Sequence, residues 1–148
     1  MLYLSGIHAL NIPCSLNTCG DWHASALQWD NLHLKQSSGS FFGNYGIEKN
    51  KTIPEHKEKY NVANHIRALL DLLQDGMFSV AQGMKNDFIC TSEYDSEVFD
   101  KIYSMHNLKN WSEIDEFMKK EYLMKWVNYR NSIAPIINFS KGADAWTN

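Results

Sequence analysis

The sequence predicts an α+β fold, in which a small N-terminal antiparallel sheet or hairpin region packs on a C-terminal bundle of three to five helices. Two observations lead to this prediction. Residues 1–47 are nearly free of charge and rich in turn residues, whereas the rest of the chain is charged and helical in pattern. Residues 60–75 then supply an amphipathic helix, whose apolar side chains recur at helical spacing: Val62, Ile66, Leu69, Leu70 and Leu73.

The chain has 148 residues, which is enough for one domain with its own hydrophobic core. Apolar residues make up 44% and aromatic residues 13% of the chain, so a folded rather than a disordered protein is expected. We expect a single domain over residues 1–148, with a charge-poor β and loop region at 1–47 and a helical region at 60–135. No internal repeat divides the sequence.

The charge-poor region is predicted to hold short strands separated by turns. Residues 1–12 alternate loosely and predict a strand that ends at Pro13. Residues 31–35 predict a second strand. Residues 24–29 fit either a short helix or a strand, and residues 41–47 fit either a glycine-interrupted strand or an aromatic loop.

Four helices are predicted after a polar connector at 48–59, with approximate bounds 60–75, 77–88, 95–106 and 110–135. Asn61 is expected to cap the first of them. The turn at Gly76 is expected to join the first two in an αα-hairpin. Pro135 is expected to end or bend the last helix, and Trp146 to fold back onto the body.

The charge and cysteine content narrow the classes of function. The formal net charge is −3, which argues against a general nucleic-acid binder, so DNA is not expected as a partner. No apolar run approaches the roughly 18 residues of a membrane span, and no secretory signal peptide is recognised. Three cysteines make a disulfide framework improbable, and thiols of a reducing cytosol are expected.

Four potential metal ligands lie close together after Pro13: Cys14, Cys19, Asp21 and His23. Zinc takes thiolate, imidazole and carboxylate ligands, so the residue types fit. The spacing differs from a Cys-x2-Cys knuckle, and His56 or His65 would have to be delivered by the fold. No cofactor is expected, and zinc is the alternative.

The same loop is a candidate thiol site, because Cys14 and Cys19 lie near His23 in the sequence. One loop that carries both groups leaves little to orient the base. Both cysteines can equally be small buried apolar groups, with Asp21 and His23 capping turns. The common nucleotide-binding and hydrolase motifs are absent from the sequence.

Aromatic side chains crowd the charge-poor region and form a candidate protein interface: Trp22, Trp29, Phe41, Phe42 and Tyr45. Residues 1–47 hold one Lys and two Asp, while the other 13 basic and 15 acidic residues follow. Trp and Tyr are enriched at the centres of protein interfaces, and a solvated surface normally carries more charge. The alternative is an aromatic core between a small sheet and the helices.

The expected function is therefore that of a non-enzymatic, cytosolic bacterial protein that binds another protein or a second copy of itself. A regulatory or neutralising protein, of the antitoxin or immunity kind, is one form of this function. The rival is a small metal-binding or thiol-dependent enzyme that uses Cys14, Cys19, Asp21 and His23, with His56 or His65 as further members.

Overall fold

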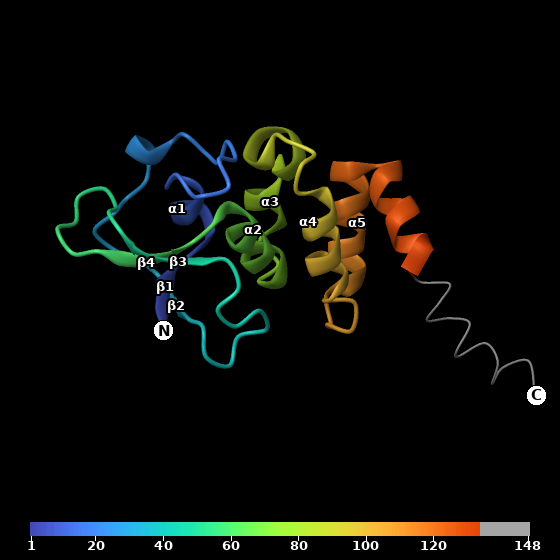
Figure 1. The fold of residues 1–148 in the computed structure, drawn as a ribbon, viewed down its shortest axis with the longest axis horizontal. Helices are drawn as coiled ribbons and strands as arrows, with labels where there is room; N and C mark the ends of the chain where they lie inside the picture. The colour runs from blue at the N-terminus through green and yellow to red at the C-terminus, as the bar shows by residue number, and fades with distance from the viewer. Residues whose placement is uncertain (134–148) are drawn as a thin grey trace, which may run out of the picture. The chain divides into compact units, whose positions relative to one another are not determined.

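The computed structural model describes residues 1–133 (Figure 1), so the expectations for Pro135 and Trp146 lie outside the described residues. The chain forms two compact units, the first from Met1 to Asp95 and the second from Ser96 onward. The boundary therefore falls far beyond residue 47, where the sequence analysis divides the chain. That the whole chain is a single domain stays a prediction.

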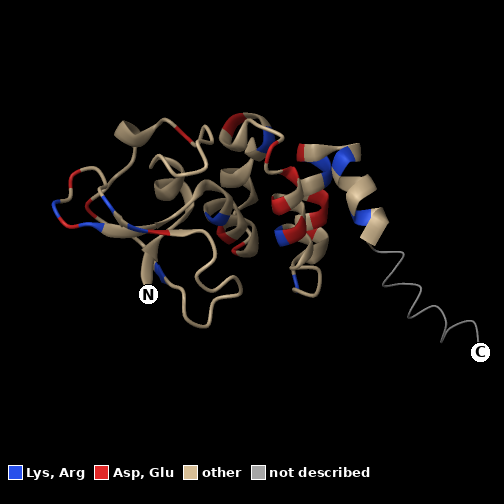
Figure 2. Cartoon of the chain, viewed as in Figure 1, with Lys and Arg blue, Asp and Glu red and all other residues tan. Residues whose placement is uncertain are grey.

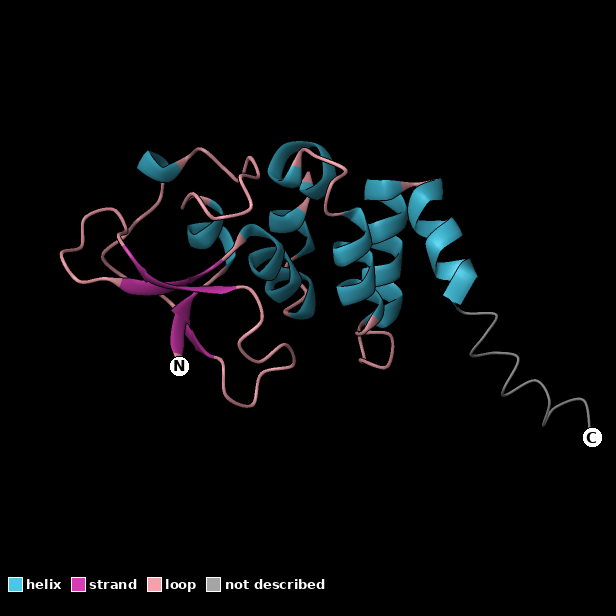
Figure 3. Cartoon of the chain, viewed as in Figure 1, coloured by secondary structure: helices cyan, strands magenta, loops and turns pink. Residues whose placement is uncertain are grey.

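The first unit contains a four-stranded sheet in the order β2-β1-β4-β3. Its strands are β1 (Leu2–Leu4), β2 (Leu34–Gln36), β3 (Ile47–Lys51) and β4 (Tyr60–Ala63). The pairs β1–β2 and β3–β4 are antiparallel, but β1 and β4 run parallel. The α+β class is confirmed, and the sheet is mixed rather than purely antiparallel. Figure 3 shows strands only in this unit, with helices in both units.

The predicted helix at 60–75 is wrong in its first turn, because residues 60–63 form the central strand β4. Val62 pairs with Leu4 on one side and with Glu48 on the other. Helix α2 (His65–Gln74) begins after Asn64, whose side chain accepts the backbone N–H of Arg67 at 2.8 Å. Asn64, and not Asn61, is therefore the N-cap. An apolar residue such as Val62 satisfies a strand and a helix pattern equally well.

Helix α2 is buried on all sides, since every residue from His65 to Leu73 is buried. It packs against α1 (Gly6–Leu10), α3 (Phe78–Ala81) and strand β4, as Figure 1 shows. Its buried side chains include three polar ones: His65, Arg67 and Asp71. Buried polar groups need partners, so α2 orders the loops around it as well as the core.

The predicted helix at 77–88 is interrupted. Helix α3 ends at Ala81, and a separate π-helical turn, η2 (Met84–Ile89), follows Gly83. Gly83 has φ +98°, and a Cβ there would lie 2.5 Å from Oδ2 of Asp87. L side chains rarely adopt this conformation, so a glycine suits the break between α3 and η2. The αα-hairpin itself is present but shorter than predicted, since α2 and α3 follow each other through Gly76 and pack together.

The N-terminal elements agree with the prediction in part. Residues 1–12 form strand β1 and then the short helix α1, rather than one strand. Ala24–Ala26 form the short 3-10 helix η1, which is the helix alternative for 24–29, and residues 41–46 form turns, which is the loop alternative for 41–47. The polar connector is shorter than predicted, since strand β3 extends to Lys51, and Figure 2 shows the charged loop that follows it.

The second unit contains α4 (Asp95–Tyr103), which begins at the boundary, α5 (Trp111–Tyr122) and a further helical segment at 124–133. Val98, Phe99 and Ile102 are buried, as their spacing predicts. The predicted last helix is broken at Leu123, which has φ 54° and ψ −132°. No helix within the described residues is long and apolar enough to cross a membrane.

Candidate functional site

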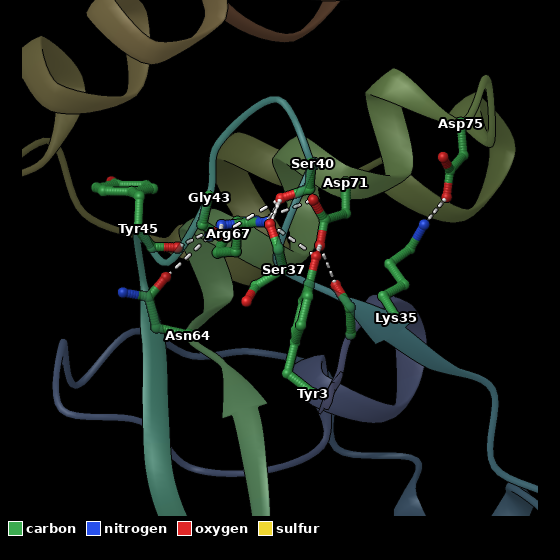
Figure 4. A network of polar contacts seen from close by, with 11 residues as sticks. Tyr3, Lys35, Ser37, Ser40, Gly43, Tyr45, Asn64, Arg67, Asp71 and Asp75 are labelled. Atoms are coloured by element: carbon green, nitrogen blue, oxygen red, sulfur yellow. Dashed lines mark hydrogen bonds and ion pairs between the residues drawn. The ribbon is translucent and has the colours of Figure 1, made fainter. Parts of the chain in front are cut away.

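A buried ion pair lies at the centre of the first unit (Figure 4). Arg67 is fully buried, and its Nε donates to Oδ1 of Asp71 at 2.9 Å. A guanidinium has five N–H groups. The other four donate to the carbonyl oxygens of Gly43 and Tyr45, the hydroxyl of Tyr3 and the hydroxyl of Ser40. No donor of Arg67 is left over for a ligand.

Asp71 is equally well satisfied. Its Oδ2 accepts hydrogen bonds from the hydroxyls of Tyr3 and Ser5, both at 2.7 Å. Burial raises the pKa of Tyr3, and its bond to the Asp71 carboxylate raises that pKa further, so the hydroxyl stays protonated. The network therefore holds β1, α2 and the loop at 40–45 together, and its function is structural.

Asp71 lies within α2 and Asp75 is the residue that follows it, and their environments differ. Asp71 is 4% exposed and belongs to the buried network. Asp75 lies at the surface, where Nζ of Lys35 donates to its Oδ2 at 2.6 Å. A polar cavity of about 240 Å³ lies beside them, with Tyr3, Ser40 and Gln74 also in its lining. Tyr3, Ser40 and Asp71 line this cavity and are already hydrogen-bonded to Arg67.

The expectation of three free thiols is wrong. Cys19 and Cys90 form a disulfide, with their Cα atoms 6.0 Å apart. Cys90 closes η2, so the bridge ties the loop after Pro13 to the end of that turn. Cys19 is therefore neither a free nucleophile nor a thiolate ligand in this structure. The expectation of a free thiol is confirmed for Cys14 alone, which is in no disulfide and is half-buried.

Cys14 lies beside His65, the first residue of α2. Cys14 Sγ is 3.5 Å from Oγ1 of Thr18, which is 2.5 Å from Nδ1 of His65. Burial raises the pKa of Cys14, but the nearby side chain and backbone N–H of His65 and the Thr18 hydroxyl outweigh it and lower the pKa to about 7. The sequence pairs the thiol with His23 and names His65 as a further member of the site, and of these two histidines the structure brings His65 close to Cys14.

His23 belongs to a separate cluster with Asp21 and Trp22. Its Nδ1 lies 2.5 Å from Oδ1 of Asp21, which also accepts the backbone N–H of Trp22 at 2.9 Å. Oδ2 of Asp21 accepts from the side chain of Asn11 at 3.1 Å. Burial raises the pKa of Asp21, but these three hydrogen bonds outweigh it and hold that pKa below its usual range.

The predicted four-residue loop site is thus divided among three places: the disulfide, the Cys14–Thr18–His65 cluster and the Asp21–His23 pair. His56 is elsewhere, where its Nε2 donates to the carbonyl of Trp29 and its Nδ1 accepts from the Tyr60 hydroxyl. Within residues 1–133, no three His, Cys, Asp or Glu side chains are placed to hold a metal ion.

The five aromatic residues of the candidate interface do not share one environment. Trp22 is 82% exposed, whereas Trp29 is 2% exposed and belongs to the core, so Trp29 is removed from the interface. Phe41 is 44% exposed and contacts Phe42, which lies beside Tyr45. In Figure 1 the light-blue segment that carries Trp22 and the cyan loop at 41–45 lie on opposite sides of the first unit. They do not form one patch in this structure.

Searches of protein-family models, curated proteins and solved structures found no match to this chain. The site is therefore defined by its own geometry. The sequence analysis does not single out Arg67, which organises the buried network, or Thr18, which lies between Cys14 and His65. The i, i+4 spacing of Arg67 and Asp71 is a signal for an ion pair. No sequence signal indicates that this pair is buried, or that Thr18 meets His65.

Proposed function

We propose that this chain acts by binding another protein, with Trp22 as the anchor of the interface. The observation that carries the proposal is the combination of exposure and order at Trp22. Its ring is 82% exposed, yet it stacks on His23 with ring centroids 4.3 Å apart. Tryptophan is the residue type most typical of interface hot spots.

The turn that presents Trp22 is held by hydrogen bonds at Asp21, on its N-terminal side. The backbone N–H of Asp21 donates to the carbonyl of Leu10 at 2.7 Å, and the Asp21 carboxylate fixes Trp22 and His23. Cys19, two residues before Asp21, is bridged to Cys90. A side chain on a fixed turn loses less conformational entropy on binding, so this arrangement favours affinity.

The gain from burying the ring is large enough to anchor a complex. A tryptophan buries on the order of 200 Å² when it enters a pocket. At about 25 cal/mol per Å², the gross transfer free energy is roughly 4–5 kcal/mol. The partner we propose is a protein with an apolar pocket that receives the indole ring.

A nucleic acid is the less favoured partner. An exposed indole can stack on a base, but phosphate contacts supply most of the affinity for nucleic acids. Asp21 is the charged residue beside Trp22, and residues 1–47 contain one Lys and no Arg. Neutralisation of a partner protein, of the antitoxin or immunity kind, is one form that protein binding takes here.

The experiment places a photo-crosslinking amino acid at position 22 in the native host and, as the matched control, at position 41. Phe41 is an exposed aromatic residue in the loop at 41–45, away from the segment that carries Trp22. The proposal predicts a discrete crosslinked protein from position 22 and not from position 41. A crosslink to a second copy of this chain would identify self-association. Crosslinks at 41 alone, or at neither position, would contradict the proposal.

The cytoplasmic location needs a separate test. The expectation of a reducing cytosol rests on free thiols, whereas the Cys19–Cys90 disulfide favours an oxidising compartment. Alkylation of free thiols in intact cells, followed by mass spectrometry, distinguishes the two. Labelled Cys19 and Cys90 would support the cytosol, and unlabelled ones an oxidising compartment.

The rival function keeps one supporting observation. Of the predicted thiol and metal residues, only Cys14 retains a free thiol beside a histidine, and that histidine is His65. The metal or thiol enzyme that the sequence predicts requires Cys19 and His23 together with Cys14. In the structure, Cys19 is bonded to Cys90 and His23 is paired with Asp21.

A further inference from the structure

The orientation of the buried His65 ring fixes where its protons lie. Its Nε2 is 2.8 Å from the carbonyl oxygen of Ile12, which can only accept a hydrogen bond. Nε2 therefore carries the hydrogen, and in the neutral ring Nδ1 is the acceptor. The ring is also confined by Gly20, where a Cβ would lie 2.6 Å from its Cε1. His65 is 1% exposed, so no water competes for these positions.

Thr18 connects this ring to the thiol. Since Nδ1 of His65 accepts, the Thr18 hydroxyl donates to it at 2.5 Å and has no hydrogen left for Cys14. The Cys14 S–H therefore donates to Thr18 Oγ1, 3.5 Å away. The three side chains form a continuous chain of hydrogen bonds from sulfur to imidazole. A nucleophile, a base and a group that orients the base are the parts of an activated nucleophile.

The chain permits proton transfer without movement of heavy atoms. The thiol proton passes to Thr18 Oγ1, and the Thr18 proton passes to Nδ1 of His65. The products are a Cys14 thiolate and a His65 imidazolium, whose Nε2–H still donates to Ile12. The Thr18 hydroxyl then donates to the thiolate. The backbone N–H of His65, at the start of α2, also favours the thiolate and lowers the pKa of Cys14.

Other charges close to Cys14 are paired with each other. Lys51 donates to the carbonyl of Pro13, and Glu48 accepts the backbone N–H of Ser15 at 2.9 Å. Lys51 Nζ and Glu48 Oε1 lie 2.8 Å apart, so their charges largely offset each other. The state of Cys14 therefore depends mainly on Thr18 and His65.

We propose that Cys14 is a reactive thiol and a covalent modification site, which forms a mixed disulfide with low-molecular-weight disulfides of the glutathione class. The Cys14 thiolate attacks one sulfur of the disulfide, the S–S bond breaks, and the second sulfur leaves as a thiolate that takes a proton. Cys14 is half-buried and is not one of the residues enclosed in the core. The inference uses residues other than Trp22 and stands independently of the proposed interface.

The test measures the rate of iodoacetamide alkylation of Cys14 between pH 5.5 and pH 9.5 on the full, disulfide-containing chain. The wild type is compared with Thr18→Val, which removes the relay, and with Thr18→Ser, which keeps it. Wild type and Thr18→Ser are expected to show an inflection near pH 7. Thr18→Val should shift it toward the ordinary thiol value of about 8.5.

At pH 7 the Thr18→Val protein should react more slowly, by up to about threefold if the inflection moves fully to the ordinary thiol value. About fifteenfold less thiolate is partly offset by about fivefold higher nucleophilicity of the more basic sulfur. Incubation with glutathione disulfide should add one glutathione to the wild type and none to Cys14→Ser.

Three results would overturn the inference: a wild-type inflection at or above about pH 8.5, equal profiles for Thr18→Val and Thr18→Ser, or no glutathione adduct on the wild type. If Thr18→Val does not fold, as judged by circular dichroism, the wild-type profile and the adduct decide the matter.

Discussion

Two aspartates, Asp71 within helix α2 and Asp75 at its C-cap, provide a matched test of the buried network. In Asp71→Asn the carboxylate becomes an amide of nearly the same shape, and in Asp75→Asn the same change is made at the surface. Asp71 is 4% exposed and paired with the fully buried Arg67. The Lys35–Asp75 pair has side-chain exposures of 38% and 44%. The two variants thus differ in burial and partners rather than in chemistry.

The expected cost of Asp71→Asn is about 3–5 kcal/mol, because removing one member of a buried ion pair leaves the other charge uncompensated. The amide in Asp71→Asn would also lose hydrogen bonds at the position of Oδ2. That atom accepts from Tyr3 and Ser5, and an NH2 group in its place would face two donors. Asp75→Asn should cost about 0–1 kcal/mol, as exposed ion pairs do.

Urea denaturation followed by far-UV circular dichroism measures both free energies of unfolding. A loss of about 3–5 kcal/mol is a large part of the roughly 5–15 kcal/mol that stabilises a typical domain. If Asp71→Asn is destabilised by no more than about 1 kcal/mol relative to Asp75→Asn, the ion pair does not hold this part of the fold together, and the structural function assigned to Arg67 is wrong.

Three further predictions concern stability. The Cys19→Ser/Cys90→Ser double variant should lose about 4 kcal/mol of unfolding free energy, since the bridge spans 71 residues of sequence; an unchanged urea midpoint would show that the bridge does not form. Leu123→Gly should stabilise the second unit by about 1 kcal/mol, because φ 54° with ψ −132° is a conformation that only glycine adopts freely; a lower melting temperature would refute this. Asn64→Ala should cost about 1 kcal/mol through loss of the α2 cap, whereas Asn61→Ala, whose side chain makes an exposed bond to Leu2, should cost less.

The sequence predicts the fold class and the main helical faces because these depend on the periodicity of apolar residues. Val98, Phe99 and Ile102 are buried as their spacing requires. Periodicity does not separate strand from helix in a short apolar stretch, so the strand at Val62 is missed. The breaks at Gly83 and Leu123 depend on backbone angles that the apolar pattern does not report.

The candidate site is harder to predict, since it depends on contacts between distant residues. Cys19 and Cys90 are 71 residues apart, and three cysteines alone do not reveal which two pair. His65 lies 47 residues from Thr18 in the sequence, while His23 lies much closer to Cys14 and is the wrong partner. Proximity in sequence identifies the correct loop but not the correct base.

The aromatic interface was predicted from residue type and local charge, and neither of these gives the exposure of a side chain. Trp22 and Trp29 lie seven positions apart in the same charge-poor region, yet one is exposed and the other is buried. The difference comes from the Asp21 turn, which directs Trp22 outward, and from the hydrogen bond that the Trp29 indole donates to Ala24.

The proposed interface predicts a specific affinity change with the protein that crosslinks at position 22. Isothermal titration calorimetry with that protein, comparing wild type, Trp22→Ala and Phe41→Ala, measures it directly. Trp22→Ala should weaken binding by at least about 30-fold, the equivalent of a hot-spot loss of 2 kcal/mol, while Phe41→Ala binds as the wild type does. Equal dissociation constants for wild type and Trp22→Ala would contradict the assignment of Trp22 as the anchor.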